Sequence, residues 1–326
     1  QGEARLRGLE CRGAEALGWQ GEARLRGLEC CGAVCRGAEA LGWQGKARLR
    51  GLAGMMSKKT FSTSKLDMRI PRYDAYIFDL DGTVYLGDAL LPGAAVTIAR
   101  LRDAGSQVIF LSNNPTRTRE QYAAKLTALG IPTTADEVIN SSYVMVQWLL
   151  AEAPGSRVFV VGEQPLCDEL SAAGFDLADN ADGVQFVIAS FDRTFTYRKL
   201  QIAFDAIRAG ARFVATNPDR YCPTPTGGEP DAAAMIAAIE ACTARQVEVV
   251  VGKPSPIMVQ TIAGTLRLPP AQCLVVGDRL ETDIAMGRAA GMATALTLTG
   301  ATGRCALAEA TIRPDYVIES IATLIE

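Results

Sequence analysis

The sequence predicts an α/β fold of two domains, built on a parallel sheet that helices cover. From Tyr73 onward, short apolar runs rich in Val, Ile and Phe alternate with longer Ala- and Leu-rich amphipathic stretches, which is typical of βα units. The chain has 326 residues, 48% of them hydrophobic, which at roughly 150 residues per domain is enough for two domains. The expected strands are 75–78, 107–111, 157–161, 185–189, 212–215, 247–251, 273–276 and 293–296.

Residues 1–68 are a low-complexity, repetitive tail that we expect to be disordered. QGEARLRGLEC occurs from Gln1 and again from Gln20, and CRGAEALGWQ occurs from Cys11 and again from Cys35. The leucines of this segment are too sparse to offset the entropy lost on ordering the chain. Three later methionines offer alternative translation starts: Met55, Met56 and Met68.

The composition argues against several partners and compartments. With 33 basic and 36 acidic residues the net charge is −3, so the basic surplus of a nucleic-acid-binding protein is absent and no nucleic acid is expected. No apolar run reaches the 18 or so residues of a membrane span, and no signal peptide is recognisable, so we expect no membrane contact and a cytoplasmic protein. Nine scattered cysteines, an odd number, fit reduced thiols.

The chain contains no histidine, which restricts the chemistry available to it. Ser-His-Asp triads, Cys-His pairs and His-ligated zinc are excluded. Any general acid or base must therefore be sought first among the carboxylates.

Two carboxylates follow the first expected strand. Tyr76-Ile77-Phe78 leads directly into Asp79-Leu80-Asp81-Gly82-Thr83, and the glycine permits a tight turn. A strand that ends in an Asp-Gly turn is common, so this motif alone leaves a purely structural role open.

Polar side chains also follow two further strands. Ser112, Asn113 and Asn114 come directly after one strand, and short polar groups with backbone N–H donors can hold phosphate oxygens. Lys253 follows another strand, where it could offset carboxylate charge and reach a phosphate. Ordinary turn formation and a solvated lysine are the alternatives.

A fourth strand ends in Gly277-Asp278-Arg279-Leu280-Glu281-Thr282-Asp283. In open α/β sheets, ligands bind at the carboxyl ends of the strands, so Asp278 is expected near Asp79. Magnesium takes oxygen ligands, with only one or two carboxylates from the protein. Asp79, Asp278 and a backbone carbonyl would suffice to hold Mg²⁺.

The four segments, in this order, resemble the four motifs of the haloacid dehalogenase (HAD) superfamily, with Asp-x-Asp-Gly-Thr as the most specific. The residues around Asn113-Asn114, Lys253-Pro254 and Asp278 resemble the motifs of the NagD-like, 4-nitrophenylphosphatase branch. The resemblance covers Tyr73 to the end of the chain. It implies a Rossmann-like HAD core with a parallel sheet and an inserted α/β cap domain.

The resemblance also implies a role for each motif residue. Asp79 is the expected nucleophile and Asp81 the general acid and base, while Lys253 stabilises charge. The expected phosphate-binding residues are Ser112, Asn113, Asn114 and Lys253. The expected metal ligands are Asp79, Asp81 through its carbonyl, Asp278 and Asp283, the last through water or by steadying the lysine.

The cap is expected between the second and third motifs, at residues 154–226, with the core formed by residues 69–153 and 227–326. Loop 216–221 is the candidate specificity loop, because it follows an apolar strand and offers polar contacts such as Asn217 and Asp219. An Asn-Pro-Asp surface turn is the alternative explanation.

The expected function is a magnesium-dependent phosphatase that hydrolyses a small phosphorylated metabolite, such as a sugar phosphate, through an aspartyl-phosphate. A non-catalytic phosphate- or Mg²⁺-binding module, a phosphomutase and a dehalogenase are the alternatives. Asp81 argues against a dehalogenase, which needs no proton for an alkoxide. A homodimer formed through the caps is a further expectation from the resemblance.

Overall fold

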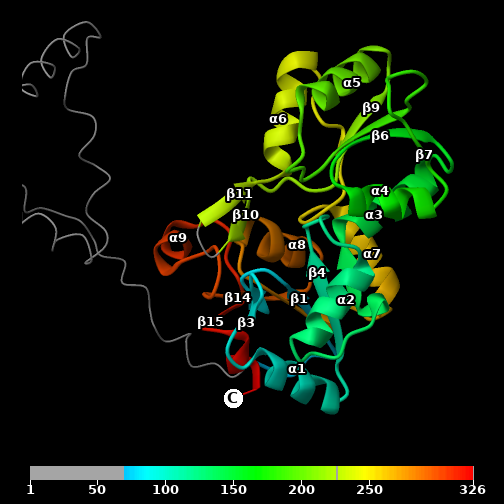
Figure 1. Cartoon of the computed structure of the whole chain (residues 1–326). Helices are drawn as coiled ribbons and strands as arrows, with labels where there is room; N and C mark the ends of the chain where they lie inside the picture. The colour runs from blue at the N-terminus through cyan, green and yellow to red at the C-terminus, as the bar shows by residue number, and fades with distance from the viewer. Residues whose placement is uncertain (1–69, 225–226, 326) are drawn as a thin grey trace, which may run out of the picture. The chain divides into compact units, whose positions relative to one another are not determined.

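The structure, a computed structural model, describes residues 70–224 and 227–325, and the predicted tail of residues 1–68 lies outside this range. Its first sheet has six parallel strands in the order β15-β14-β13-β1-β4-β5 (Figure 1). The strands are β1 (Ala75–Asp79), β4 (Gln107–Ser112), β5 (Val138–Asn140), β13 (Cys273–Gly277), β14 (Ala293–Thr297) and β15 (Tyr316–Ile318).

Both faces of this sheet are buried. Along β1, Ala75 and Ile77 join one hydrophobic cluster, whereas Tyr76 and Phe78 join another on the opposite face. The first cluster includes residues of α3 (Ser141–Glu152), α7 (Pro256–Leu266) and α8 (Ala285–Ala289). The second includes residues of α1 (Ala94–Asp103) and α2 (Arg119–Ala128). The sequence of a parallel strand that is buried on both faces is a continuous apolar run, and residues 75–78 have this pattern.

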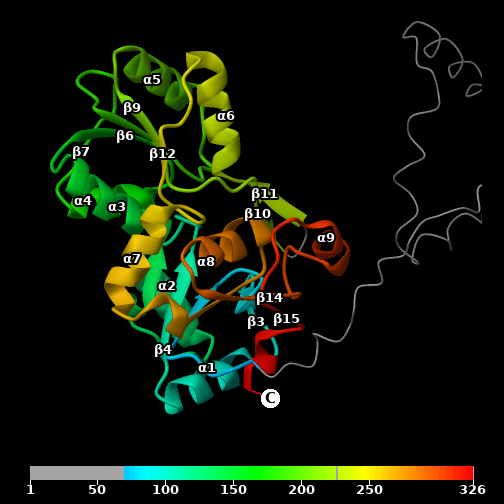
Figure 2. The ribbon, with the colours of Figure 1, turned by 180° about the vertical axis from the view of Figure 1, so that it is seen from behind.

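The second sheet has five parallel strands in the order β12-β9-β8-β6-β7. They are β6 (Arg157–Val161), β7 (Asp176–Leu177), β8 (Phe186–Ala189), β9 (Arg212–Ala215) and β12 (Val249–Val250). Its helices are α4 (Gln164–Ala172), α5 (Tyr197–Arg208) and α6 (Ala232–Thr243), and Figure 2 shows α5 and α6 with this sheet and apart from the first. The expected α/β core and inserted α/β domain are thus confirmed as a fold class.

The predicted end of the inserted domain at residue 226 is wrong. Met235, Ile236 and Ile239 of α6 pack with Phe213 of β9 in one hydrophobic cluster. β12 pairs with β9, and the chain returns to the first domain only after it. The inserted domain therefore extends to Val250, because its last strand completes its own sheet.

The remaining elements are short and lie mostly at the sheet edges and in the connections. Two hairpins join β2 (Tyr85–Leu86) to β3 (Ala89–Leu90), and β10 (Tyr221–Thr224) to β11 (Gly227–Pro230). The others are the 3-10 helices Ala135–Glu137, Pro270–Gln272 and Ile321–Ile325, a π-helical turn at Leu280–Ile284, and α9 (Arg304–Glu309).

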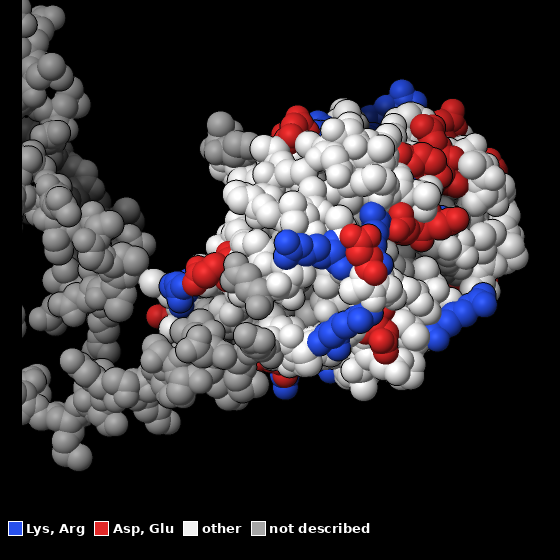
Figure 3. Space-filling view, turned by 90° about the horizontal axis from the view of Figure 1, so that it is seen from below, with Lys and Arg blue, Asp and Glu red and all other residues white. Residues whose placement is uncertain are grey.

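Surface charge is mixed on the face seen in Figure 3, where Lys and Arg lie among Asp and Glu with uncharged areas between them. No helix in the described part of the chain is long and apolar enough to cross a membrane.

Candidate active site

The carboxyl end of β1 is the centre of the candidate site. Asp79 is the last residue of β1, which pairs with β4 on one side and β13 on the other. In the turn that follows, the Leu80 carbonyl accepts backbone hydrogen bonds from Thr83, Val84 and Tyr85. Gly82 has a φ of 90°, and a Cβ there would lie 2.6 Å from Asp278 Oδ2. The glycine therefore allows the turn and the fourth motif to approach each other.

Lys253 joins the first and fourth motifs. Its Nζ lies 2.5 Å from Asp79 Oδ1 and 2.7 Å from Asp283 Oδ1, and the side chain is only 3% exposed. Burial lowers the pKa of Lys253, but the carboxylates of Asp283 and Asp79 more than offset this and raise it above its ordinary value. The lysine therefore stays a cation at neutral pH, as a charge-stabilising role requires.

Asn113 fixes the backbone of this lysine. Its Oδ1 accepts a hydrogen bond from the Lys253 backbone N–H at 2.7 Å, and its Nδ2 donates to the Lys253 carbonyl at 3.1 Å. The same Nδ2 donates to Asp219 Oδ2 at 2.7 Å. Asn113 lines the pocket, but its amide already has protein partners, so it orients Lys253 more directly than it can bind phosphate.

Ser112 and Asn114 lie at the same rim, at the end of β4. The Ser112 hydroxyl accepts from the Asn114 backbone N–H at 3.1 Å and lines the pocket. The Asn114 side chain accepts from Thr116 and donates to Cys222 Sγ at 3.5 Å. The Ser112 hydroxyl also donates to the Tyr122 hydroxyl at 3.4 Å, so both Ser112 and Asn114 line the pocket with side chains that already have protein partners.

Asp79, Asp278 and Asp283 form a carboxylate cluster whose ligand atoms lie within 4.8 Å of one another. Asp283 has both oxygens engaged, one by Lys253 at 2.7 Å and one by the Arg279 backbone N–H at 3.1 Å. Asp278 Oδ2 accepts from the Ala301 backbone N–H at 2.5 Å. Asp79 and Asp278 thus each keep one oxygen without a hydrogen-bond partner among the described residues, whereas Asp283 is placed to act through Lys253 or water.

The charges of this cluster fit a divalent cation. Lys253 pairs with Asp79 and Asp283, whereas Asp278 forms no ion pair with a residue of the described ranges. Burial raises the pKa of Asp79 well above its ordinary value, although Lys253 opposes the shift, and burial likewise raises the pKa of Asp278. Hard oxygen donors with uncompensated charge are the ligands that Mg²⁺ prefers. The Asp81 carboxylate is not part of the cluster, which leaves its carbonyl as the predicted ligand there.

Asp81 lines the same pocket. Burial raises the pKa of Asp81 above its ordinary value, and the cations of Lys125 and Arg117 only partly offset this. A carboxyl with a raised pKa keeps its proton more readily, as a general acid must.

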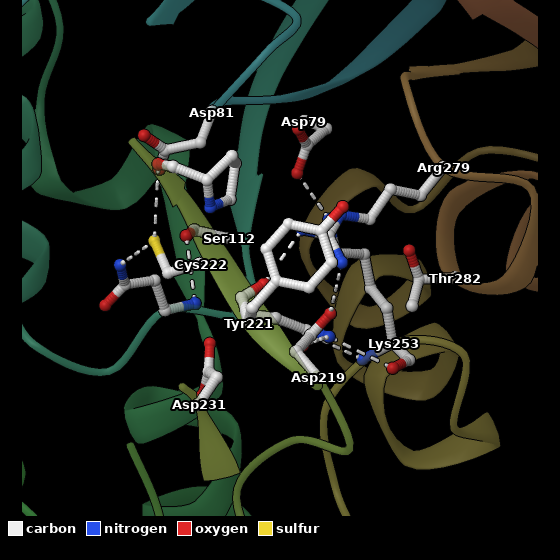
Figure 4. A pocket seen from close by; sticks show the side chains of 13 residues that line it. Asp79, Asp81, Ser112, Asp219, Tyr221, Cys222, Asp231, Lys253, Arg279 and Thr282 are labelled. Atoms are coloured by element: carbon white, nitrogen blue, oxygen red, sulfur yellow. Dashed lines mark hydrogen bonds and ion pairs between the residues drawn. The ribbon is translucent and has the colours of Figure 1, made fainter. Parts of the chain in front are cut away.

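The cap supplies the opposite wall of the pocket. Asp219, Tyr221, Cys222, Pro223 and Asp231 line it, and Figure 4 shows Asp219 and Asp231 across the pocket from Asp79 and Asp81. The candidate loop 216–221 and the β10–β11 hairpin after it thus reach the site.

Asn217 has a different place from the one predicted. It is fully buried and does not line the pocket. Its Nδ2 donates to Asp219 Oδ2 at 2.9 Å and to Asp231 Oδ1 at 3.0 Å. Asn217 therefore positions two pocket carboxylates and does not itself face a ligand.

Arg279 connects the core to the cap. Its guanidinium lies 3.5 Å from Asp219 Oδ1, donates to the Tyr221 carbonyl at 3.0 Å and lies over the Tyr221 ring. Arg279, Cys222, Asp231 and Thr282 are pocket residues that our sequence analysis did not assign. For Arg279 the signal was present, because it follows the predicted ligand Asp278 directly.

Comparison with known proteins identifies the family. Residues 76–176 match the model described as haloacid dehalogenase-like hydrolase, and residues 250–324 match a second, HAD-hydrolase-like model. The chain is 40% identical over 245 residues to the sugar-phosphatase AraL of Bacillus subtilis, covering 75% of this chain and 89% of the relative. The chain belongs to the haloacid dehalogenase-like hydrolase family.

Solved structures place the chain in the NagD-like, 4-nitrophenylphosphatase branch of this HAD family, as its motifs predicted. The 4-nitrophenylphosphatase of Thermotoga maritima superposes with a TM-score of 0.74 at 34% identity, covering 77% of this chain and 96% of that one. A glycerol phosphate phosphatase of Mycobacterium tuberculosis, in complex with magnesium, gives 0.72 at 33% identity, with coverages of 78% and 76%. The fold is thus shared over most of each chain.

Proposed function

We propose that this chain is a magnesium-dependent phosphatase that hydrolyses a small phosphorylated metabolite, a sugar phosphate or a similar monoester, through an aspartyl-phosphate intermediate. The enzyme class, a phosphoric monoester hydrolase, follows from its named relatives. The observation that carries the mechanism is the contact of Lys253 with Asp79 inside a cluster of three carboxylates.

Asp79 is the nucleophile in this proposal. Lys253 holds its Oδ1, and Oδ2 has no hydrogen-bond partner among the described residues, so that oxygen can attack phosphorus. Attack forms the Asp79 O–P bond while the bond from phosphorus to the leaving oxygen breaks. A carboxylate and a phosphate repel each other, and the buried ammonium of Lys253 offsets this repulsion.

Asp81 moves the protons. In the first step its carboxyl transfers a proton to the leaving alkoxide, and its raised pKa favours the protonated form that this requires. In the second step the resulting carboxylate takes a proton from water, and the hydroxide attacks phosphorus. The Asp79 O–P bond then breaks, inorganic phosphate leaves, and Asp81 is protonated again.

The groups that would hold Mg²⁺ are the carboxylates of Asp79 and Asp278 and the carbonyl of Asp81. Asp283 would act through Lys253 or water. When bound, the ion offsets charge on the phosphoryl oxygens. Ser112 and the backbone of the β4 loop would hold the remaining phosphate oxygens. The cap-mediated homodimer and the cytoplasmic location stay predictions.

The test is phosphate release from 4-nitrophenyl phosphate with and without Mg²⁺, for the unmodified protein, Asp79→Asn and the control Asp88→Asn. Asp88 is 94% exposed, so its variant should match the unmodified protein. We expect Mg²⁺-dependent turnover that Asp79→Asn abolishes, and a phosphoprotein after acid quench that Asp79→Asn cannot form. Binding of phosphate and Mg²⁺ without turnover of any monoester would instead support a binding module.

A further inference from the structure

Asp231 is a buried carboxylate in the pocket that the proposed mechanism does not use. It is 3% exposed and lines the pocket from the cap side (Figure 4). Its Oδ1 accepts from Asn217 Nδ2 at 3.0 Å and from the Ala232 backbone N–H at 2.5 Å. Its Oδ2 has no hydrogen-bond partner within residues 70–224 and 227–325, so one oxygen of a buried carboxyl is available to a ligand.

Neither cation of the described pocket lining, Lys253 or Arg279, forms an ion pair with Asp231. Lys253 contacts Asp79 and Asp283. Arg279 contacts Asp219 and donates to the Tyr221 carbonyl. The cap side of the pocket thus offers an unpaired acceptor and no unpaired cation among its described lining residues.

Helix capping explains the contacts of only one of the two carboxylate oxygens of Asp231. Asp231 is the N-cap of α6, and the bond from Ala232 to Oδ1 serves that purpose. Capping needs one acceptor oxygen, which Asn and Ser also supply. The second oxygen takes no part in capping, and the side chain lines the pocket, so Oδ2 is open to a hydrogen-bond donor of a ligand.

We propose that Asp231 is a specificity-determining residue, which accepts hydrogen bonds from hydroxyl groups of the leaving group and disfavours monoesters whose leaving group carries a carboxylate or second phosphate. This inference rests on the proposed phosphatase function and adds to it the class of substrate, an uncharged polyhydroxylated phosphate monoester. Burial, which weakens screening, strengthens both the attraction for hydroxyl donors and the repulsion of anions.

A matched pair of ligands tests this. Glycerol 3-phosphate and 3-phosphoglycerate share a carbon chain and differ by a hydroxymethyl group in place of a carboxylate. We would measure kcat/KM for both with Mg²⁺, in the unmodified protein and in Asp231→Asn and Asp231→Ser, which keep the helix cap. We expect the unmodified protein to prefer glycerol 3-phosphate by about tenfold to a hundredfold, and both variants to lose most of this preference.

The control is Thr196→Ala, which removes the N-cap of α5 in the same domain but lies outside the pocket lining. It should lower stability and leave the preference intact. An unchanged preference in the Asp231 variants, or a preference of the unmodified protein for 3-phosphoglycerate, would overturn the proposal.

A binding measurement separates this proposal from the phosphatase mechanism. Titration calorimetry of both ligands into Asp79→Asn and Asp79→Asn/Asp231→Asn, with Mg²⁺, needs no turnover. The affinity ratio should narrow in the double variant even if 4-nitrophenyl phosphate is never hydrolysed. Equal ratios in the two proteins, alongside normal turnover by the unmodified enzyme, would remove Asp231 from specificity and leave the mechanism standing.

Discussion

The two walls of the pocket are built in different ways. On the core wall, Asp79 and Asp278 lie at or next to the ends of adjacent parallel strands. Lys253 forms ion pairs with both Asp79 and Asp283. On the cap wall, Asp219 and Asp231 are held by a buried amide, Asn217, in loops beyond the ends of β9 and β11. The core wall is thus tied to the sheet itself, whereas the cap wall depends on loops that can change without altering the sheet. The contrast suggests that chemistry resides in the core and selection in the cap.

The largest effect is expected from breaking the core wall at Lys253. Lys253→Ala leaves two buried carboxylates without their cation, so kcat should fall about a hundredfold to a thousandfold. The free energy of unfolding should fall by about 3 to 5 kcal/mol. Turnover of 4-nitrophenyl phosphate and urea denaturation measure the two effects.

Lys199→Ala is the matched control, because Lys199 Nζ lies 2.6 Å from the buried Asp192 in the cap, outside the pocket lining. It should destabilise the protein without changing kcat. Equal losses of kcat in both variants would mean that Lys253 acts only on stability.

A smaller effect is expected from weakening the metal cluster on the same wall. Asp278→Asn removes a charged oxygen ligand, so the Mg²⁺ concentration for half-maximal activity should rise by about tenfold to a hundredfold. The rise in melting temperature on adding Mg²⁺ should shrink in parallel, because binding to the folded state stabilises it. Asp176→Asn, an exposed carboxylate paired with Arg157, should behave as the unmodified protein. An unaltered Mg²⁺ requirement would exclude Asp278 as a ligand.

The contact between the two walls can be tested through Arg279. Arg279→Gln removes the pairing with Asp219 and the bond to the Tyr221 carbonyl, so the cap wall should be held less firmly against the core. We expect KM for glycerol 3-phosphate to rise by about tenfold, more than kcat falls. Arg288→Gln, which breaks a surface pair with Asp315, is the control. A loss confined to kcat would place Arg279 in the chemistry.

The smallest expected effect is a pH dependence of the preference for glycerol 3-phosphate over 3-phosphoglycerate. Burial raises the pKa of Asp231 to about 7, with Asn217 opposing and Asp219 adding to the shift, while Arg279 opposes it. Asp231 therefore ionises as the pH rises from 6 to 8, and its repulsion of an anionic leaving group grows in that direction. The ratio of kcat/KM for glycerol 3-phosphate over 3-phosphoglycerate should rise a few-fold across this range. In Asp231→Asn the ratio should stay flat, and a rise that persists there would assign the titration to another group.

The sequence predicted those parts of the fold that carry a local pattern. All eight expected strands are present in the two sheets, because each is an apolar run long enough to stand out. The strands β5, β7 and β15, each two or three residues long at a sheet edge, were not foreseen; β12 is as short and also at an edge, but it lies in the apolar run Val249-Val250-Val251. The end of the cap was misplaced because it depends on β12 pairing with β9, a long-range contact that the Ala-rich α6 sequence does not reveal.

The candidate site divides in the same way. Asp79, Ser112 and Asp278 follow strands directly, so strand order brings them to one rim and a local motif is enough to find them. Asp231 and Cys222 reach the pocket only through the folding of the cap hairpin, which no motif marks. Asn217 was expected to contact the substrate, but its amide donates to Asp219 and Asp231. The sequence cannot distinguish an amide that bridges two carboxylates from one that faces a ligand.

The interruption of the core by the cap has a consequence for synthesis on the ribosome. Asp79 and Lys253, which touch in the finished protein, are 174 residues apart, and the strand that flanks β1 on one side, β13, is made after both. While the cap emerges, β1 can pair with β4 but keeps an open edge on its other side, the kind of edge that recruits foreign strands. A nascent chain of this protein therefore carries the proposed nucleophile, Asp79, without Lys253 and with one edge of β1 unpaired, until the last quarter of the sequence is translated.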